Sequence, residues 1–252
     1  MTIKNHFKII IPSYNNEKWL RACLNSVKLQ SYEDYQCIVI DDCSTDNSVA
    51  IIEEEVGTNG KFFLIKNETR KLALRNIYEA VEGSSPNRED VIITLDGDDW
   101  LATKNTLETL NNIYQKSVCW MTYGSYMEYP SKTRGKFSRQ IPEAIIDSNS
   151  FRESEWMSSH MRTFKYKLWA KIKKEDFLKE DGSFCDGAWD MIFMFPMLEM
   201  CGPRAQFVQD IMYIYNRDNP LNEDKVNHPK LYRSETRIRN KTKYERIIKD
   251  DI

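Results

Sequence analysis

The sequence has no apolar run of the ~20 residues that a membrane-spanning helix needs. Its first apolar run, residues 7–11, is ended by Pro12 and is also too short for a secretory leader. We therefore expect neither a membrane span nor a signal peptide. The prediction is a cytoplasmic protein that is soluble or attached to a membrane only at its surface.

The sequence also lacks a large net charge and any closely spaced pair of cysteines. Its 36 Lys and Arg residues nearly balance 38 Asp and Glu residues, for a formal charge of -2. Nucleic-acid-binding chains usually carry a basic surface, so no nucleic-acid partner is expected. The absence of a Cys-x-x-Cys pair argues against a zinc site or a disulfide framework. Six scattered cysteines are expected to be buried thiols in a reducing compartment: Cys23, Cys37, Cys43, Cys119, Cys185 and Cys201.

The first hundred of the 252 residues alternate between strand and helix patterns. Continuous β-branched, apolar runs predict strands at 7–11, 37–40, 62–65 and 91–95, each buried on both faces. Helical spacing of apolar residues fills the segments between them. This alternation predicts an α/β fold with a mostly parallel central sheet flanked by helices.

The second half is less regular. Helices are predicted at 106–114, 164–172 and 187–200, the last one containing Pro196, and strands at 119–127 and 206–215. The polar segment 130–149 reads as a mobile flap. Residues 230–249 hold eight Lys or Arg against two Glu. Such a basic tail can touch an anionic membrane or acceptor, although the pattern favours a solvated terminal helix.

Polar clusters follow three of the predicted strands: residues 12–15, the pair Asp41-Asp42, and residues 96–99. In an α/β sheet, ligands bind beyond the carboxyl ends of the strands. Two carboxylates around a glycine, as in Asp96-Gly97-Asp98, suit Mg²⁺ or Mn²⁺ bound to a substrate's phosphates. An ordinary Asp-rich turn is the alternative for this cluster, and helix capping is the alternative for Asp41-Asp42.

These motifs resemble, in order and in spacing, the family 2 glycosyltransferases of the GT-A fold. The resemblance rests on IIIPSYNNEKWLRACLNSVKLQSYEDYQCIVIDDCSTDNS and on VIITLDGDDWL; it is strong over residues 9–101 and loose beyond. It implies one domain over 1–252, with a nucleotide-sugar-binding half (1–101), an irregular acceptor and catalytic half (102–220) and a basic tail (221–252). It also implies transfer of a sugar from a nucleotide-diphosphate donor, with UDP favoured, to a hydroxyl on a glycan, lipid or protein. The implied mechanism is inverting displacement with an Asp base and Mn²⁺ or Mg²⁺.

The resemblance assigns roles on the donor side. Asp42 pairs with the base edge with Asp41 beside it, Asp96 lies near the ribose or the metal, and Asp98 coordinates the metal on the diphosphate. The remaining nucleotide-binding candidates are Pro12, Ser13, Tyr14, Arg75 and its neighbour Asn76. The sequence departs from the family pattern at Leu74, where the family has alanine before the Arg-Asn pair.

On the acceptor side, the resemblance places a general base near the start of a downstream helix. Asp190 in FCDGAWDMIFMF is the first choice and Asp186 the alternate, although the family's common Glu-Asp pair is absent. Either aspartate can instead be a helix cap. His160 and Arg162 are candidates for acceptor or phosphate contact, with Lys165 and His228 as weaker ones.

Two other functions remain open. A sugar-1-phosphate nucleotidyltransferase also combines an α/β sheet with a metal, but it is expected to have a glycine-rich phosphate loop where this chain has PSYNNEKW. A binding module that has lost turnover is the second alternative, and the presence of the aspartates argues against it.

Overall fold

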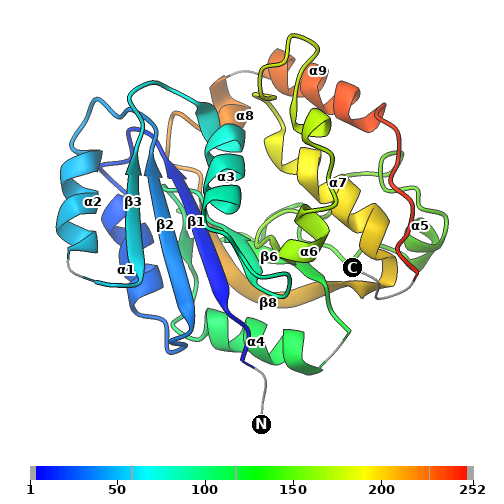
Figure 1. Ribbon diagram of the computed structural model, residues 1–252, viewed down its shortest axis with the longest axis horizontal. Coiled ribbons are helices and arrows are strands. Elements are labelled where there is room, and N and C mark those ends of the chain that lie inside the picture. The colour runs from blue at the N-terminus through cyan, green and yellow to red at the C-terminus, as the bar shows by residue number, and fades with distance from the viewer. Residues whose placement is uncertain (1–3, 58, 117, 227, 249–252) are drawn as a thin grey trace.

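The computed structural model describes residues 4–57, 59–116, 118–226 and 228–248. In these residues, eight strands form one sheet in the order β3-β2-β1-β4-β7-β6-β8-β5 (Figure 1). The strands are β1 (Phe7–Ser13), β2 (Tyr35–Asp41), β3 (Phe62–Lys66), β4 (Val91–Thr94), β5 (Trp100–Leu101), β6 (Met121–Tyr129), β7 (Thr163–Lys165) and β8 (Ala205–Asn216).

The sheet has a parallel half and a mixed half. β1 pairs in parallel with β2 and β4, and β2 with β3. β7 is antiparallel to both β4 and β6, β6 and β8 are parallel, and β5 is antiparallel to β8. The parallel arrangement predicted for the first hundred residues is therefore confirmed, while the second half mixes both directions.

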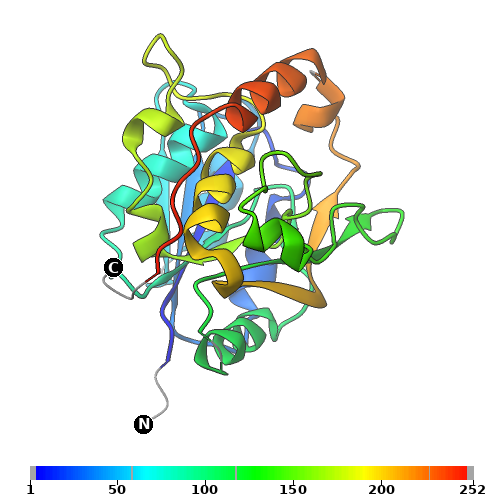
Figure 2. The ribbon, with the colours of Figure 1, turned by 90° about the vertical axis from the view of Figure 1, so that its right-hand side faces the viewer.

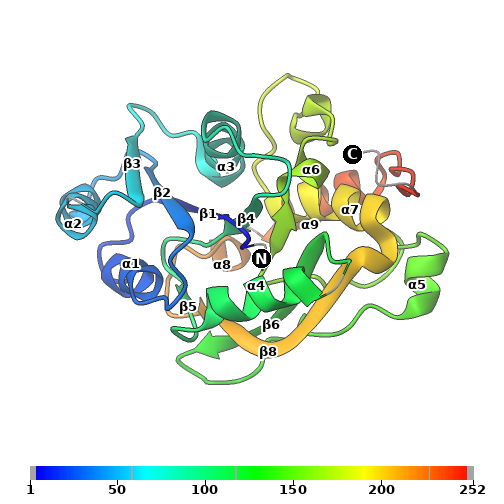
Figure 3. The same ribbon diagram turned by 60° about the horizontal axis from the view of Figure 1, so that its bottom comes forward.

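Helices cover both faces of the sheet, as its doubly buried strands require. One face packs against α3 (Leu72–Gly83) and α7 (Trp189–Cys201), and the other against α1 (Leu20–Lys28) and α4 (Thr106–Lys116), an arrangement visible in Figure 3. Along β1, Ile10 joins the first core, and Ile9 and Ile11 join the second. The other helices are α2 (Ser48–Val56), α5 (Glu143–Asp147), α6 (Tyr166–Trp169), α8 (Glu223–Val226) and α9 (His228–Arg239), with single turns of 3₁₀-helix at Lys174–Phe177 and Gly202–Arg204.

The predicted helix at 164–172 is wrong in its first part. Thr163–Lys165 forms β7, which fills the space between β4 and β6, and only Tyr166–Trp169 is helical. Phe164 is fully buried in this position. The sheet pairing on both sides outweighs the helical spacing of the apolar residues, which is only a local preference.

The basic tail is held against the protein. After α9, residues 240–248 run along α7 (Figure 2), and the Ile247 N–H donates to the carbonyl of Met200 at 2.9 Å. Its cations make internal contacts: Lys241 bonds to the carbonyl of Asp176 at 2.7 Å, and Lys243 pairs with Glu153 at 2.8 Å. The predicted terminal helix therefore ends at Arg239, and the residues after it pack along α7.

The segment 130–149, predicted to be a mobile flap, is also tied to the body. Arg134 donates to the carbonyl of Gln209 at 2.6 Å, and Ile141 is buried. The short helix α5 lies within the segment. Among the described residues, no helix is both long enough and apolar enough to cross a membrane.

Candidate active site

The polar clusters meet at one edge of the sheet, as predicted. The Asp42 N–H donates to the carbonyl of Ser13 at 2.8 Å, and the Gly97 N–H donates to the carbonyl of Pro12 at 3.1 Å. The carboxyl ends of β2, β1 and β4 thus lie side by side. The last residues of β8 and the first turn of α7 reach the same edge, so the two halves of the chain build the site together.

Gly97 is required where the turn after β4 meets β1. A Cβ at this position would lie 2.8 Å from Cβ of Ser13 and 2.9 Å from the side-chain nitrogen of Asn16. Both distances are shorter than normal carbon contacts, so a larger residue would push the turn away. The glycine lets Asp96 and Asp98 sit directly against the end of β1.

Asp99 anchors this turn to β8. Its two oxygens accept hydrogen bonds from the Tyr213 hydroxyl at 2.6 Å and from the Asn216 N–H at 2.7 Å. The same hydroxyl accepts from the Asp96 N–H at 3.2 Å. Burial, reinforced by Asp98 and Asp96, raises the pKa of Asp99 well above its usual range. Asp99 is therefore a structural carboxyl, a role that the sequence did not reveal.

Asp98 is held from beyond β8. Its Oδ2 accepts a hydrogen bond from Nδ2 of Asn219 at 2.7 Å, while Oδ1 of Asn219 accepts from the Leu221 N–H at 2.9 Å. Burial raises the pKa of Asp98, and the bond from Asn219 opposes that rise. Sequence reasoning missed Asn219, although the polar run that follows β8 could have suggested a site segment.

Arg162 lies between carboxylates from the two halves of the chain. Its Nη1 donates to Oδ2 of Asp190 at 2.8 Å, and its Nη2 is 3.6 Å from Oδ2 of Asp96. The ring of Trp189 lies 4.9 Å from the guanidinium carbon. Burial, opposed by Arg162 and reinforced by Asp98 and Asp190, raises the pKa of Asp96 to about 7.

His160 is a neutral ring in an aromatic stack. It lies 4.5 Å from the ring of Tyr213 and 5.1 Å from that of Tyr215, nearly parallel to both. Burial, with Arg162 adding to it, lowers the pKa of His160 well below its usual value. The ring therefore carries no charge, and a charged contact from His160 to phosphate is disfavoured.

The carboxylates and His160 offer a donor set for a divalent cation. Ligand atoms of Asp96, Asp99 and His160 lie within 4.8 Å of one another. Because both oxygens of Asp99 already accept hydrogen bonds, Asp96 with the nearby Asp98 fits better, with the neutral imidazole as a further donor. Carboxylate oxygens and an imidazole nitrogen suit Mn²⁺, and carboxylates alone suit Mg²⁺.

On the nucleoside side, Asp41 and Asp42 differ in their hydrogen-bond partners. Both oxygens of Asp42 are occupied by protein donors: Asn67 Nδ2 at 3.0 Å, Arg70 Nε at 3.1 Å, Lys71 N at 2.8 Å and Leu72 N at 2.9 Å. Burial would raise the pKa of Asp42, but these donors outweigh it and lower the pKa. A carboxylate offers about four acceptor positions, so none is left for a base edge. Oδ1 of Asp41, by contrast, is buried without a partner.

Three other predicted residues contact protein side chains in the structure, and a fourth is exposed. The guanidinium of Arg70 lies 3.3 Å from the centre of the Tyr14 ring and covers one face. Arg75 pairs with Glu79 at 2.6 Å. Lys165 pairs with Glu89 at 2.6 Å. His228 is exposed at the start of α9.

The two candidate bases have different surroundings. Asp186 pairs with Lys230 at 3.1 Å and Lys179 at 3.6 Å, and although burial acts the other way, these lysines lower its pKa. Asp190 lies in the first turn of α7, accepts a hydrogen bond from the Met191 N–H at 3.0 Å, and reaches the site through Arg162.

Unpartnered polar atoms gather at this edge of the sheet. Buried polar groups in proteins nearly always have hydrogen-bond partners. Among the described residues, most of the buried side-chain atoms without one belong to the site: Asp41 Oδ1, Asn76 Nδ2, Thr94 Oγ1, His160 Nδ1, Arg162 Nε and Nη2, and Asn216 Nδ2. This concentration indicates a place for a polar molecule.

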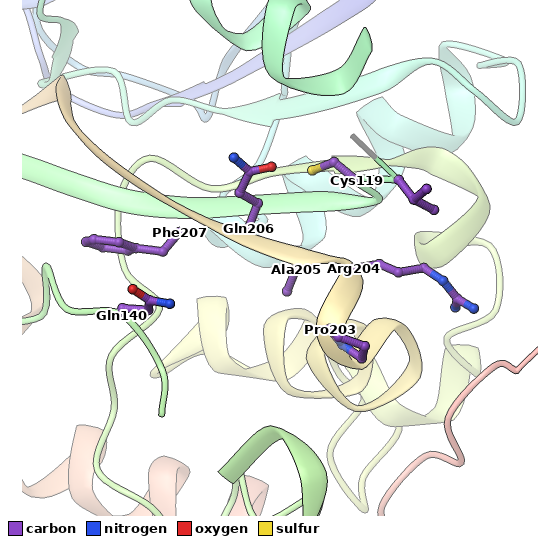
Figure 4. Close-up of a pocket in the computed structure, with 8 residues that line it drawn as sticks. Cys119, Gln140, Pro203, Arg204, Ala205, Gln206 and Phe207 are labelled. Atoms are coloured by element: carbon purple, nitrogen blue, oxygen red, sulfur yellow. The ribbon is translucent and has the colours of Figure 1, made fainter. Parts of the chain in front are cut away.

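A separate hollow of about 510 Å³ lies at the other end of β8 (Figure 4). Its lining includes Cys119, Gln140, Arg204 and Phe207. β8 begins at this hollow with Ala205 and ends at the carboxylates with Asn216, so the hollow is not part of the acidic site.

Comparison of the sequence with models of known protein families gives a match. The model of Glycosyl transferase family 2 matches residues 8–179. Glycosyltransferase GlyA of Streptococcus pneumoniae is 28% identical over 184 residues, which are 69% of this chain and 25% of GlyA. Glycosyltransferase GlyG of the same organism is 25% identical over 221 residues, 83% of this chain and 70% of GlyG. The match thus spans only a quarter of GlyA but most of GlyG.

Structure comparison gives the fold. S. aureus TarS 1–349 in complex with UDP-GlcNAc aligns with a TM-score of 0.61 and 17% identity, covering 85% of this chain and 59% of that one. The mannosyltransferase PcManGT from Pyrobaculum calidifontis, in complex with GDP-Man and Mn²⁺, aligns with a TM-score of 0.58 and 16% identity. The alignment covers 88% of this chain and 59% of PcManGT. Such identities show the fold alone, and they confirm the predicted GT-A architecture.

Proposed function

The chain belongs to glycosyl transferase family 2, and from that premise we propose that it moves a hexose from a nucleotide-diphosphate donor to a hydroxyl acceptor with inversion. The observation that carries this proposal is the Arg162 guanidinium, which contacts Asp190 at 2.8 Å and lies 3.6 Å from Asp96. A donor-side and an acceptor-side carboxylate thereby share one site.

Asp98 and Asp96 would hold Mn²⁺ or Mg²⁺, with the neutral ring of His160 beside them. When bound, the metal offsets the negative charge that develops on the departing diphosphate. Asn219 and Gly97 support this arrangement, because the first fixes the Asp98 carboxylate and the second lets the turn reach β1.

For the nucleoside, Asp41 is the proposed acceptor of a base N–H, because one of its oxygens lacks a partner. Ser13, Pro12 and Tyr14 would border the nucleoside, and Asp42 would support the pocket by holding the start of α3. UDP is the favoured nucleotide; the TarS complexes contain UDP and UDP-GlcNAc.

Asp190 is the proposed general base. It would accept the proton of the acceptor hydroxyl from its place in the first turn of α7. Asp186 is the weaker candidate, because its carboxylate is already paired with Lys179 and Lys230. The acceptor is proposed only as a hydroxyl-bearing glycan, lipid or protein.

The test is donor turnover by purified protein. The protein is incubated with UDP- and GDP-sugars and Mn²⁺ or Mg²⁺, and the released nucleoside diphosphate is measured. We expect metal-dependent hydrolysis or transfer. Asp98→Asn should weaken metal-dependent donor binding, whereas Asp190→Asn should retain binding and lose at least a hundredfold in transfer rate. Nucleotide binding without turnover on any acceptor would favour a binding module, and full transfer by Asp190→Asn would promote Asp186.

A further inference from the structure

Arg162 is a buried cation with unused hydrogen-bonding capacity. Only 2% of its side chain is exposed. Nη1 bonds to Asp190, but Nε and Nη2 have no hydrogen-bond partner. A buried donor without a partner destabilises a protein, so these two unpartnered nitrogens point to a group that completes them.

The position of Arg162 identifies that group. In an inverting displacement, the base acts on the face of the anomeric carbon opposite the leaving diphosphate, so the transferred sugar lies between them. Arg162 spans from Asp96, on the diphosphate side, to Asp190, the proposed base. We propose that Arg162 forms the subsite of the transferred sugar, with Nε and Nη2 donating to its hydroxyl oxygens. This inference rests on the proposed function.

The charges around Arg162 favour a neutral sugar over a second phosphate. Asp96 and Asp98 would hold the divalent cation of the proposed function, and Asp190, at 2.8 Å, already balances the charge of Arg162. A further anion would therefore find no unbalanced cation here, whereas hydroxyl groups can accept from Arg162 and donate to Asp190. We therefore expect an uncharged hexose and not a uronic acid.

The ring of Trp189 fixes the plane of the guanidinium. It lies 4.9 Å from the guanidinium carbon and belongs to the same helical turn as Asp190. A planar guanidinium that is held on both its face and one edge presents its remaining N–H groups in fixed directions. Lysine keeps the charge, but its N–H groups rotate about a single nitrogen and cannot match the fixed directions of the planar guanidinium, which provides a discriminating variant.

The experiment compares binding of UDP with that of UDP-glucose and UDP-N-acetylglucosamine, measured by calorimetry in the presence of Mn²⁺. For Arg162→Lys and Arg162→Met, we expect UDP to bind as it does to the wild type, while the better sugar nucleotide binds about 10- to 100-fold more weakly. Arg204→Lys is the matched control, because Arg204 lies 3.9 Å over Trp120 at the far end of β8. It should change neither affinity.

Monodeoxy analogues of the sugar provide a test that does not depend on the folding of Arg162→Met. On the wild type, at least one deoxy analogue should bind more weakly, and that loss should vanish in Arg162→Lys. If the Arg162 variants lose the same factor in affinity for UDP and for the sugar nucleotide, Arg162 contacts a phosphate and the proposal is overturned. Unchanged affinity for the sugar nucleotide would also overturn it. If the wild type binds no nucleotide at all, the result would instead contradict the proposed function itself, and the subsite proposal with it.

Discussion

Asn219 donates a hydrogen bond to Asp98 at 2.7 Å and so joins the segment after β8 to the turn after β4. Its amide orientation is set, because its oxygen accepts from the Leu221 N–H. Asn219 lies outside residues 8–179, the part of the chain that the family model matches. A residue beyond the matched part therefore positions a proposed metal ligand within it.

Asn219→Ser should weaken Mn²⁺ binding about 10- to 100-fold, the usual cost of losing a residue that orients a metal ligand. Serine can still accept from the Leu221 N–H but is too short to reach Asp98. An electron paramagnetic resonance titration with Mn²⁺ measures this without requiring turnover. Asn222→Ser is the control, since Asn222 bonds to the carbonyl of Asn216 in the same segment. Equal losses in both variants would mean that only the loop fold matters.

Gly97→Ala should destabilise the protein by about 1–3 kcal/mol, because the added Cβ meets Ser13 and Asn16 at 2.8–2.9 Å. Donor turnover should fall with it, since the turn carries Asp96 and Asp98. Urea unfolding measures the first effect. Gly83→Ala, where a Cβ meets nothing within 4 Å, should shift stability by less than about 0.5 kcal/mol. A Gly97→Ala protein as stable as wild type would show that the turn has room.

Asp42→Asn should cost about 2 kcal/mol at neutral pH, because a charged acceptor of several buried hydrogen bonds is lost. The pKa of Asp42 is lowered in the folded protein, so its contribution is fully present above the unfolded value of about 3.9. It is lost as the pH falls through the lower folded value. The stability gap between wild type and variant, measured by urea unfolding, should therefore narrow below about pH 4. A gap that stays constant down to pH 2 would contradict the lowered pKa.

Glu199→Gln should destabilise the protein by about 3–5 kcal/mol, because it leaves Arg152 as a buried cation without its counter-charge. The same carboxylate accepts from the Tyr244 N–H at 2.9 Å, so the segment after α9 should also become sensitive to proteases. Thermal unfolding and limited proteolysis measure both effects. The exposed pair Arg139–Glu155 is the control: Glu155→Gln should change stability by less than about 0.5 kcal/mol. Equal effects of the two substitutions would rule out a special role for the buried pair.

The parallel half and the location of the site were readable from the sequence, because each depends on local signals. A strand buried on both faces must be continuously apolar, as β1 is, and polar residues directly after it fall at the sheet edge. For that reason the convergence of Asp41 and Asp96 on one edge was predictable. The family model and the structural neighbours confirm the family and the fold.

The errors arose where distant contacts decide the outcome. β7 has only three residues, and its strand conformation depends on β4 and β6 beside it. The sequence also does not show that backbone N–H groups at the start of α3 donate to Asp42. The run of residues 96–99 does not show which carboxyl is structural, since Tyr213 selects Asp99 from more than a hundred residues away.

The hydrogen bonds that Tyr213 and Asn216 donate to Asp99 limit how this chain can be recombined with its relatives. A C-terminal part taken from another protein must place a hydroxyl and a backbone N–H where those of Tyr213 and Asn216 lie. Otherwise the Asp99 carboxyl loses its hydrogen-bond partners. Chimeras that exchange everything after β7 should therefore lose donor recognition as well as acceptor choice. Those that keep α7 together with β8 and the residues up to Asn219 should lose only the latter.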